Sequence, residues 1–326
     1  QKTAYEISTR DWSSDVCSSD LLPAPFTWCA LEGTTVVRFA HCNEMLDGSV
    51  ADHFRWFAAR GYTGVELAPF TLAPTIVNVA EVVRRGLREA AHDAGIAITG
   101  LHWLLAGPAA KPEGWHLTTP DRSARERTVS YLAELCRFCE QVGGSVLVLG
   151  SPNQRSATGG LTVAQATSNL IESLAALMPA VENAGVTLCL EPLPLGETDV
   201  ITNCDEALAV IRAVGHPALR LVLDVKSLVA ESHATNEPVP DIIRRVGHEV
   251  AYVQANDGNR GHPGSGTTDF VPICQALRDV GYDGWISMEP FEFGPGPDTV
   301  AREGLACLER AWAATAPNRN VVHGRA

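Results

Sequence analysis

The chain of 326 residues is 45% hydrophobic and 19% charged, a composition too apolar for a disordered protein. That length suits two mid-sized domains or one α/β barrel, which takes ~250 residues plus extensions. With 25 basic against 38 acidic residues the net charge is −13, which argues against binding to the phosphates of nucleic acids. No apolar run of about 18 residues is present, so we expect no membrane span. Nine cysteines without a disulfide-like spacing are typical of a reducing compartment, and we therefore expect a cytoplasmic protein.

The first 21 residues differ in character from the rest. The segment Asp11–Leu21 has neither a helical nor a strand period, and it resembles the translation of a short sequencing adapter. We therefore expect residues 1–21 to be a non-native artefact. Residues 22–35 would then form a lead-in, residues 36–314 a catalytic barrel and residues 315–326 a flexible tail.

From residue 36 onward, short apolar segments alternate with longer amphipathic ones, several of which end at a glycine. The apolar segments predict strands over residues 36–40, 64–68, 96–102, 145–149, 186–191, 219–224, 250–254 and 285–289. The amphipathic segments predict helices over residues 49–60, 80–94, 126–142, 163–184, 204–214, 239–246, 270–280 and 299–314. Mostly apolar strands are typical of a parallel sheet covered on both faces. Eight such units predict a single (β/α)8 TIM barrel rather than an open doubly wound sheet.

Neither common nucleotide-binding fingerprint supports a different reading of this pattern. No Gly-x-Gly-x-x-Gly follows the first predicted strand, and no Gly-x-x-x-x-Gly-Lys-Ser/Thr occurs. The chemistry is therefore sought at the carboxyl ends of the strands, where barrels of this kind have their active sites.

The last four predicted strands each end with an oxygen-bearing side chain, namely Glu191, Asp224, Gln254 and Glu289. Adjacent parallel strands lie about 4.8 Å apart, so four such groups can converge on one point. Three carboxylates there would repel one another unless a cation neutralised them, and a divalent metal is the simplest explanation. The alternative is that each acid only caps the helix that follows it.

The motifs around these residues are Leu190-Glu191-Pro192, Leu223-Asp224, Gln254-Ala255-Asn256-Asp257 and Met288-Glu289-Pro290. Together they resemble the sugar isomerase/epimerase superfamily, which has a xylose-isomerase-like barrel and includes ketose 3-epimerases and hydroxypyruvate isomerases. The resemblance covers most of residues 36–314. It implies a divalent cation held by Glu191, Asp224, Gln254 and Glu289. It also implies two substrate-binding residues at the family's offsets, Glu197 and Arg260.

The chain departs from that family at two positions. Gln254 stands where the family usually has His, and an all-oxygen site favours Mn²⁺, with Mg²⁺ or Co²⁺ as alternatives. Otherwise Gln254 does not ligate, and the metal site is weak or lost. The family's epimerases often carry His three residues after the aspartate, where this chain has Ser227 beside Lys226, so substrate contacts from that strand must differ.

These residues suit the removal of a proton next to a carbonyl. The resulting enediolate is anionic, and a metal between its two oxygens stabilises that charge. Inversion of a carbon centre requires an acid/base group on each face of the substrate, and we expect Glu191 and Glu289 to be that pair. The residues expected to bind or enclose substrate are His102, Trp103, Glu197, Arg260 and Glu66, and His41 and Glu44 lie at the end of the first strand.

Four functions are compatible with this pattern. The first is a metal-dependent sugar isomerase or epimerase that acts on a small-molecule sugar, with a homodimer as one expected assembly. The second is a lyase that uses the same proton abstraction for β-elimination of an oxidised (3-keto) C-glycoside, together with a small second subunit. A metal-dependent endonuclease shares the barrel, but the acidic charge and the lack of several His ligands argue against it. The fourth is a non-catalytic binding barrel in which Gln254 marks loss of the site.

Overall fold

The computed structural model describes residues 37–106 and 114–315. The expectations for residues 1–21, 22–35 and most of the tail lie outside these described residues. Within them, no helix is both long enough and apolar enough to cross a bilayer.

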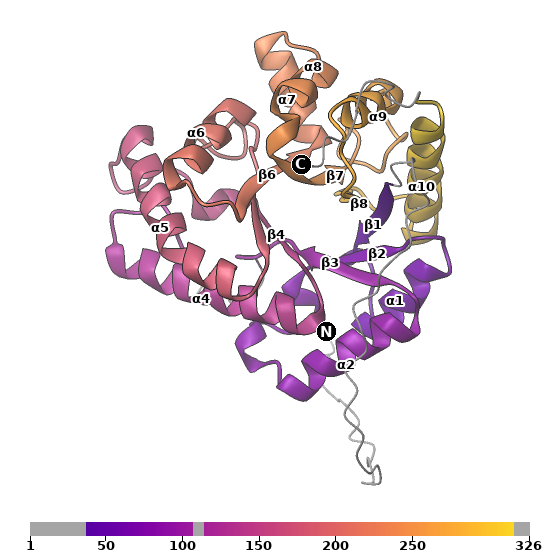
Figure 1. Ribbon diagram of the computed structural model, residues 1–326, viewed down its shortest axis with the longest axis horizontal. Coiled ribbons are helices and arrows are strands. Elements are labelled where there is room, and N and C mark those ends of the chain that lie inside the picture. Colours follow the sequence, from indigo (N-terminus) through magenta and orange to yellow (C-terminus); the bar gives the residue numbers. More distant parts are fainter. Residues whose placement is uncertain (1–36, 107–113, 316–326) are drawn as a thin grey trace, which may run out of the picture. The chain divides into compact units, whose positions relative to one another are not determined.

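In the described part of the chain, eight parallel strands close into a barrel in sequence order, with β8 pairing to β1. The strands are β1 (Arg38–Cys42), β2 (Gly64–Leu67), β3 (Ala97–Leu101), β4 (Val146–Leu149), β5 (Thr187–Leu190), β6 (Leu219–Asp224), β7 (Val250–Ala255) and β8 (Trp285–Met288). The helices lie around the strands (Figure 1). The predicted (β/α)8 barrel is confirmed.

The longer helices of the described residues alternate with these strands. They are α1 (Val50–Ala58), α2 (Glu81–Asp93), α4 (Arg122–Val142), α5 (Val163–Asn183), α6 (Cys204–Val214), α7 (Val225–Thr235), α8 (Val239–Val246), α9 (Phe270–Asp279) and α10 (Pro297–Ala313). Helix α7 is absent from the predicted elements. It begins directly after β6 with no turn residue between them, because the Asp224 side chain accepts the backbone N–H of Ser227 and caps the helix.

Two apolar clusters hold the barrel together. The larger one packs residues such as Leu147 and Leu149 of β4 against the surrounding helices. A smaller one uses the alternate positions of the same strands, among them Val146, Val148 and Tyr252, and fills the barrel interior. The strands are therefore buried on both faces, which explains their nearly continuous apolar sequences.

The strand register aligns the residues that follow β5 to β8. Asp224 lies opposite Gln254, and Gln254 lies opposite Ser287. The ladder continues past the strands, since the Glu289 amide donates to the Ala255 carbonyl at 3.1 Å and the Glu191 amide to the Leu149 carbonyl at 3.1 Å. The strand-end side chains are thus brought to one end of the barrel.

Candidate active site

Three carboxylates converge at the carboxyl end of the barrel. Glu191 follows β5, Asp224 ends β6 and Glu289 follows β8, and one oxygen from each lies within 4.8 Å of the others. All three residues are buried. Gly150, which follows β4, permits this arrangement, because a Cβ at that position would clash with the Glu191 carboxylate.

Asn256 ties these strand ends together. Its amide nitrogen donates to Asp224 Oδ2 at 2.6 Å and to the Glu289 carbonyl at 3.0 Å. Its amide oxygen accepts the backbone N–H of Lys226 at 2.8 Å. With Ser227 N–H on its other oxygen at 2.8 Å, Asp224 is both a helix cap and a member of the cluster. Capping and metal binding, which the sequence presents as alternatives, are therefore compatible at this residue.

Repulsion among these three carboxylates would favour a bound cation. Burial raises the pKa of Glu191 to about 8, and the Asp224 carboxylate adds to the rise, while Lys226 opposes it. Burial, with repulsion from Glu191 and Asp224, also holds the pKa of Glu289 well above its ordinary value. A divalent cation among these oxygens would relieve that repulsion.

The Gln254 side chain fits a metal site as well. It is fully buried, and its amide nitrogen donates to Glu66 Oε1 at 3.1 Å. That bond directs the amide oxygen away from Glu66, and this oxygen is buried without a hydrogen-bond partner. An orphaned buried acceptor is costly unless a ligand satisfies it, and a hard cation accepts such an oxygen.

Glu44, Glu66 and His102, from the ends of β1 to β3, form what we call the acidic wall. His102 Nε2 lies 3.0 Å from Glu44 Oε2, and His102 Nδ1 lies 3.8 Å from Glu66 Oε1. Burial lowers the pKa of His102, but the two carboxylates outweigh it and the net shift is upward. Burial raises the pKa of Glu66, which also accepts the Tyr252 hydroxyl at 3.2 Å.

Arg155, Lys226 and Arg260 form a cationic wall on the other side, around the carboxylate of Glu197. Lys226 Nζ lies 2.9 Å and Arg260 Nη1 lies 3.6 Å from Glu197 Oε1. Both cations lie over the ring of Phe291, at 5.3 and 4.6 Å from its centroid. Aromatic faces attract cations, so Phe291 helps to fix both side chains.

The loop after β7 holds Arg260 in place. The Asp257 carboxylate accepts the backbone N–H groups of Gly264, Gly266 and Thr268 at 3.0 to 3.2 Å. Arg260 itself has a φ of 71°, a left-handed conformation that is unfavourable for a non-glycine residue. Strain of this kind persists where the surrounding structure enforces it and is concentrated at functional sites.

Arg155 is the most deeply buried cation of the site. Its Nη1 donates to the Leu149 carbonyl at 3.3 Å, while Nε and Nη2 are buried without a partner. Burial lowers its pKa to about 10, and the fields of Glu191 and Glu197 oppose that fall. Arg155 therefore remains charged at neutral pH and faces the two acids.

Trp103 lies at the rim of the site. Its side chain contacts Phe70 and Phe291 edge to face, each with 6.4 Å between ring centroids. The residue is 40% exposed, and its φ is 52°, again left-handed. An aromatic side chain in this position can cover a bound sugar and limit the access of water.

The structure gathers the predicted residues into connected groups. Glu191, Asp224 and Glu289 form the cluster, Gln254 donates to Glu66, and Glu197 pairs with Arg260. The prediction missed Arg155, Asn256 and Phe291, and gave Lys226 no role. Asn256 lies two residues after Gln254 in a quoted motif, which could have marked it. No sequence signal marks Arg155 or Phe291, because their contacts are tertiary.

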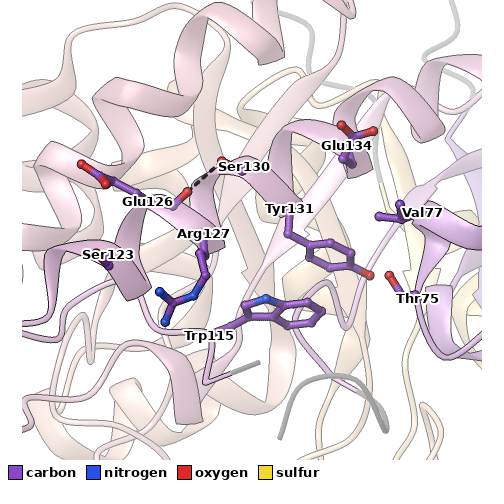
Figure 2. A pocket seen from close by; sticks show the side chains of 9 residues that line it. All are labelled: Thr75, Val77, Trp115, Ser123, Glu126, Arg127, Ser130, Tyr131 and Glu134. Carbon is purple, nitrogen blue, oxygen red and sulfur yellow. Dashed lines mark hydrogen bonds between the residues drawn. The ribbon is translucent and has the colours of Figure 1, made fainter. Parts of the chain in front are cut away.

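A cavity elsewhere in the described residues shares no lining residue with this site. It has a volume of about 600 Å³ between the segment after β2 and the first half of α4 (Figure 2). Trp115 and Tyr131 stack in its wall with ring centroids 4.0 Å apart. It contains no cluster of metal-ligating side chains among the described residues.

Comparison with known proteins agrees with this architecture. Two curated relatives are a D-psicose 3-epimerase of Ruminiclostridium cellulolyticum, 27% identical over 78% of this chain and 83% of the relative, and an L-ribulose 3-epimerase of Mesorhizobium japonicum, 27% identical over 76% and 77%. Among solved structures, a D-psicose 3-epimerase of Clostridium cellulolyticum with D-tagatose superposes with a TM-score of 0.73 at 20% identity, covering 84% of this chain and 98% of the other. A 3-keto-D-glucoside 4-epimerase of E. coli superposes with a TM-score of 0.70 at 17% identity, covering 84% and 100%.

The family comparison covers most of the barrel. The sequence model for the xylose isomerase-like TIM barrel matches residues 54–311, which include every member of the carboxylate cluster. The resemblance inferred from the strand-end motifs is thus confirmed, and this chain belongs to the xylose isomerase-like TIM barrel family.

Proposed function

We propose that this protein is a divalent-metal-dependent sugar isomerase or epimerase that removes a proton from the carbon next to a carbonyl. The observation that carries the proposal is the buried cluster of Glu191, Asp224 and Glu289, together with the orphaned oxygen of Gln254, the residue that pairs with Asp224 across β6 and β7. The sugar substrate is supported by the epimerase relatives, which match more than three quarters of this chain.

Glu191 and Glu289 are the proposed acid/base pair. They follow β5 and β8, three strands apart around the barrel, and can therefore address a substrate from two sides. One takes the proton from carbon on its carboxylate oxygen, and the other returns a proton on the opposite face when the reaction is an epimerisation. Asp224, fixed by Ser227 and Asn256, has the purely supporting role of a ligand.

Glu191, Asp224, Gln254 and Glu289 would hold the metal, which supplies positive charge for the developing enediolate. Because all four offer oxygen, we propose Mn²⁺, with Mg²⁺ or Co²⁺ as substitutes. Glu197 and Arg260 would bind substrate oxygens, His102 and Glu66 would orient the other end, and Trp103 would exclude water.

The test is hydrogen exchange at carbon. The Mn²⁺-loaded chain is incubated in deuterated water with a panel of free ketoses, aldoses and 3-keto-glycosides, and NMR follows deuterium entering each carbon. We expect exchange on at least one substrate and a fall of about 10²- to 10⁴-fold in Glu289→Gln, which lacks the base. Glu292→Gln, an exposed glutamate three residues further on, is the matched control and should retain the parent rate.

The position of the label also decides between reaction types. Deuterium at the carbon whose configuration inverts indicates an epimerase. Transfer of hydrogen between neighbouring carbons indicates an isomerase, and release of an aglycone indicates the elimination. A metal-loaded chain that catalyses no exchange on the whole panel, or a Glu289→Gln variant that keeps the parent rate, would contradict the proposal.

A further inference from the structure

Lys226 occupies a position that is unfavourable for a lysine. It is only 7% exposed and lies in the first turn of α7, two residues after the capping residue Asp224. The N-terminus of a helix carries partial positive charge, so a cation there is repelled, and burial of an ammonium group adds to the penalty. A lysine held in such a place requires compensating negative charge.

The surrounding structure fixes this ammonium group beside the carboxylate cluster. The Lys226 backbone N–H donates to Asn256, which also binds Asp224 and Glu289. Its Nζ donates to Glu197 Oε1 at 2.9 Å and lies 3.9 Å from Asp224 Oδ1. The Phe291 ring lies on one side, 5.3 Å from Nζ to the centroid. The group therefore has a set position next to the proposed metal ligands.

The charge balance changes when the cluster holds a divalent cation. The cation offsets two of the three negative charges of Glu191, Asp224 and Glu289. Lys226 then depends mainly on the Glu197 carboxylate. That carboxylate also lies 3.6 Å from Arg260 Nη1 and interacts electrostatically with Arg155. The three cations of this wall then surround one carboxylate, Glu197, which is not a proposed metal ligand. The cationic wall therefore has a net positive charge next to the site.

We propose that Lys226 is a further catalytic residue whose ammonium group donates a hydrogen bond to the substrate oxygen on which negative charge develops. This inference rests on the proposed function. In the step, the C–H bond breaks, its electron pair moves toward that oxygen, and the proton passes to the carboxylate of Glu191 or Glu289. Lys226 keeps its own proton throughout, and the charge is relieved when a proton returns to carbon.

The experiment compares Lys226→Met, Lys226→Arg and the control Arg85→Met, which removes an exposed cation on α2 paired with Glu81. Three quantities are measured in the full chain: the Mn²⁺ dissociation constant, the rate of hydrogen exchange at substrate carbon, and the affinity of the Mn²⁺-loaded chain for glycolohydroxamate. The hydroxamate presents two adjacent oxygens and negative charge, and it probes anion binding without a reaction.

We expect Lys226→Met to lower the exchange rate by about 10²- to 10³-fold with little change in KM, as for loss of one oxyanion donor. Hydroxamate binding should weaken at least tenfold. Lys226→Met should bind Mn²⁺ at least as tightly as the parent, because a positive charge near Asp224 is gone. If Lys226 had only a structural role, its loss would lower the Mn²⁺ affinity instead. Lys226→Arg should retain part of the rate, and Arg85→Met all of it.

Two outcomes overturn the inference. One is a Lys226→Met variant that exchanges hydrogen and binds hydroxamate like the parent. The other is a loss of Mn²⁺ affinity in both Lys226 variants, which would assign the residue to the scaffold. A parent chain that exchanges no substrate contradicts the proposed function instead, and the hydroxamate affinities still decide whether Lys226 contacts an anion at this site.

Discussion

The acidic wall and the cationic wall of the site differ in charge and also in exposure. Glu66 and His102 are inaccessible to solvent or nearly so, and they bind each other, Glu44 and Gln254. On the cationic wall, Arg155 and Lys226 are buried as well, but the Arg260 and Glu197 side chains are 49% and 29% exposed. The acidic wall therefore lies away from solvent, whereas the cationic wall extends from the buried Arg155 and Lys226 to the partly exposed Arg260.

This difference indicates that the two walls have different roles in the site. Buried acids that are linked through His102 and Gln254 can set the position and charge of the cluster, but they cannot approach solvent. The partly exposed Arg260 of the cationic wall can bind and release a substrate at each turnover. The Lys226 variants test the cationic wall, and three further changes test the acidic wall and its support.

The largest expected effect is on stability, at the fully buried His41 of β1. Its ring stacks on Phe57 with 4.9 Å between centroids, and its Nε2 is buried without a partner. Burial lowers the pKa of His41 from 6.5 to about 4. The folded state therefore binds this proton less readily than the unfolded state, and stability is lost as the pH falls from about 6.5 toward 4.

Urea unfolding of metal-free protein at pH 7 and pH 4 measures this loss. The parent should lose roughly 3 kcal/mol more than His41→Gln, which cannot titrate, over that interval. Other groups titrate in both proteins and cancel in the difference. Equal losses in the two proteins would show that His41 is not held neutral in the folded state.

The next effect is on metal binding, at the residue that joins the acidic wall to the cluster. Gln254→Leu removes the orphaned oxygen and the donor to Glu66, so the Mn²⁺ affinity should fall by about 10- to 100-fold. Titration followed by electron paramagnetic resonance gives the dissociation constants. Gln254→His keeps a ligand atom and should bind Mn²⁺ at least as well as the parent.

The two Gln254 variants also separate adaptation from loss of the site. If Gln254→His binds metal more tightly but gains no exchange activity, the glutamine marks a decayed site. If Gln254→Leu binds Mn²⁺ like the parent, the amide oxygen does not ligate.

Features that depend on the local sequence pattern could be predicted, whereas contacts that depend on tertiary packing could not. The period of the apolar segments predicts the barrel, and strand ends in a barrel converge, so Glu191, Asp224 and Glu289 could be placed together without coordinates. Helix α7 was missed because Asp224 serves as both strand end and cap. The pairing of Lys226 with Glu197 could not be predicted, since it joins the first turn of α7 to the loop after β5, 29 residues away, whose path depends on packing.

The smallest effect concerns the charge of His102. Its raised pKa depends on two carboxylates, of which Glu44 at 3.0 Å is the closer and Glu66 at 3.8 Å the more distant. Glu44→Gln keeps the shape but removes one adjacent negative charge, so the pKa of His102 should fall. NMR titration of ¹³C-labelled histidine in Mg²⁺-loaded protein measures it, with Glu81→Gln, which removes an exposed charge on α2, as control. A midpoint that does not move would mean that Glu66 alone sets the charge of His102. The acidic wall would then consist of the Gln254–Glu66–His102 chain, with Glu44 outside it.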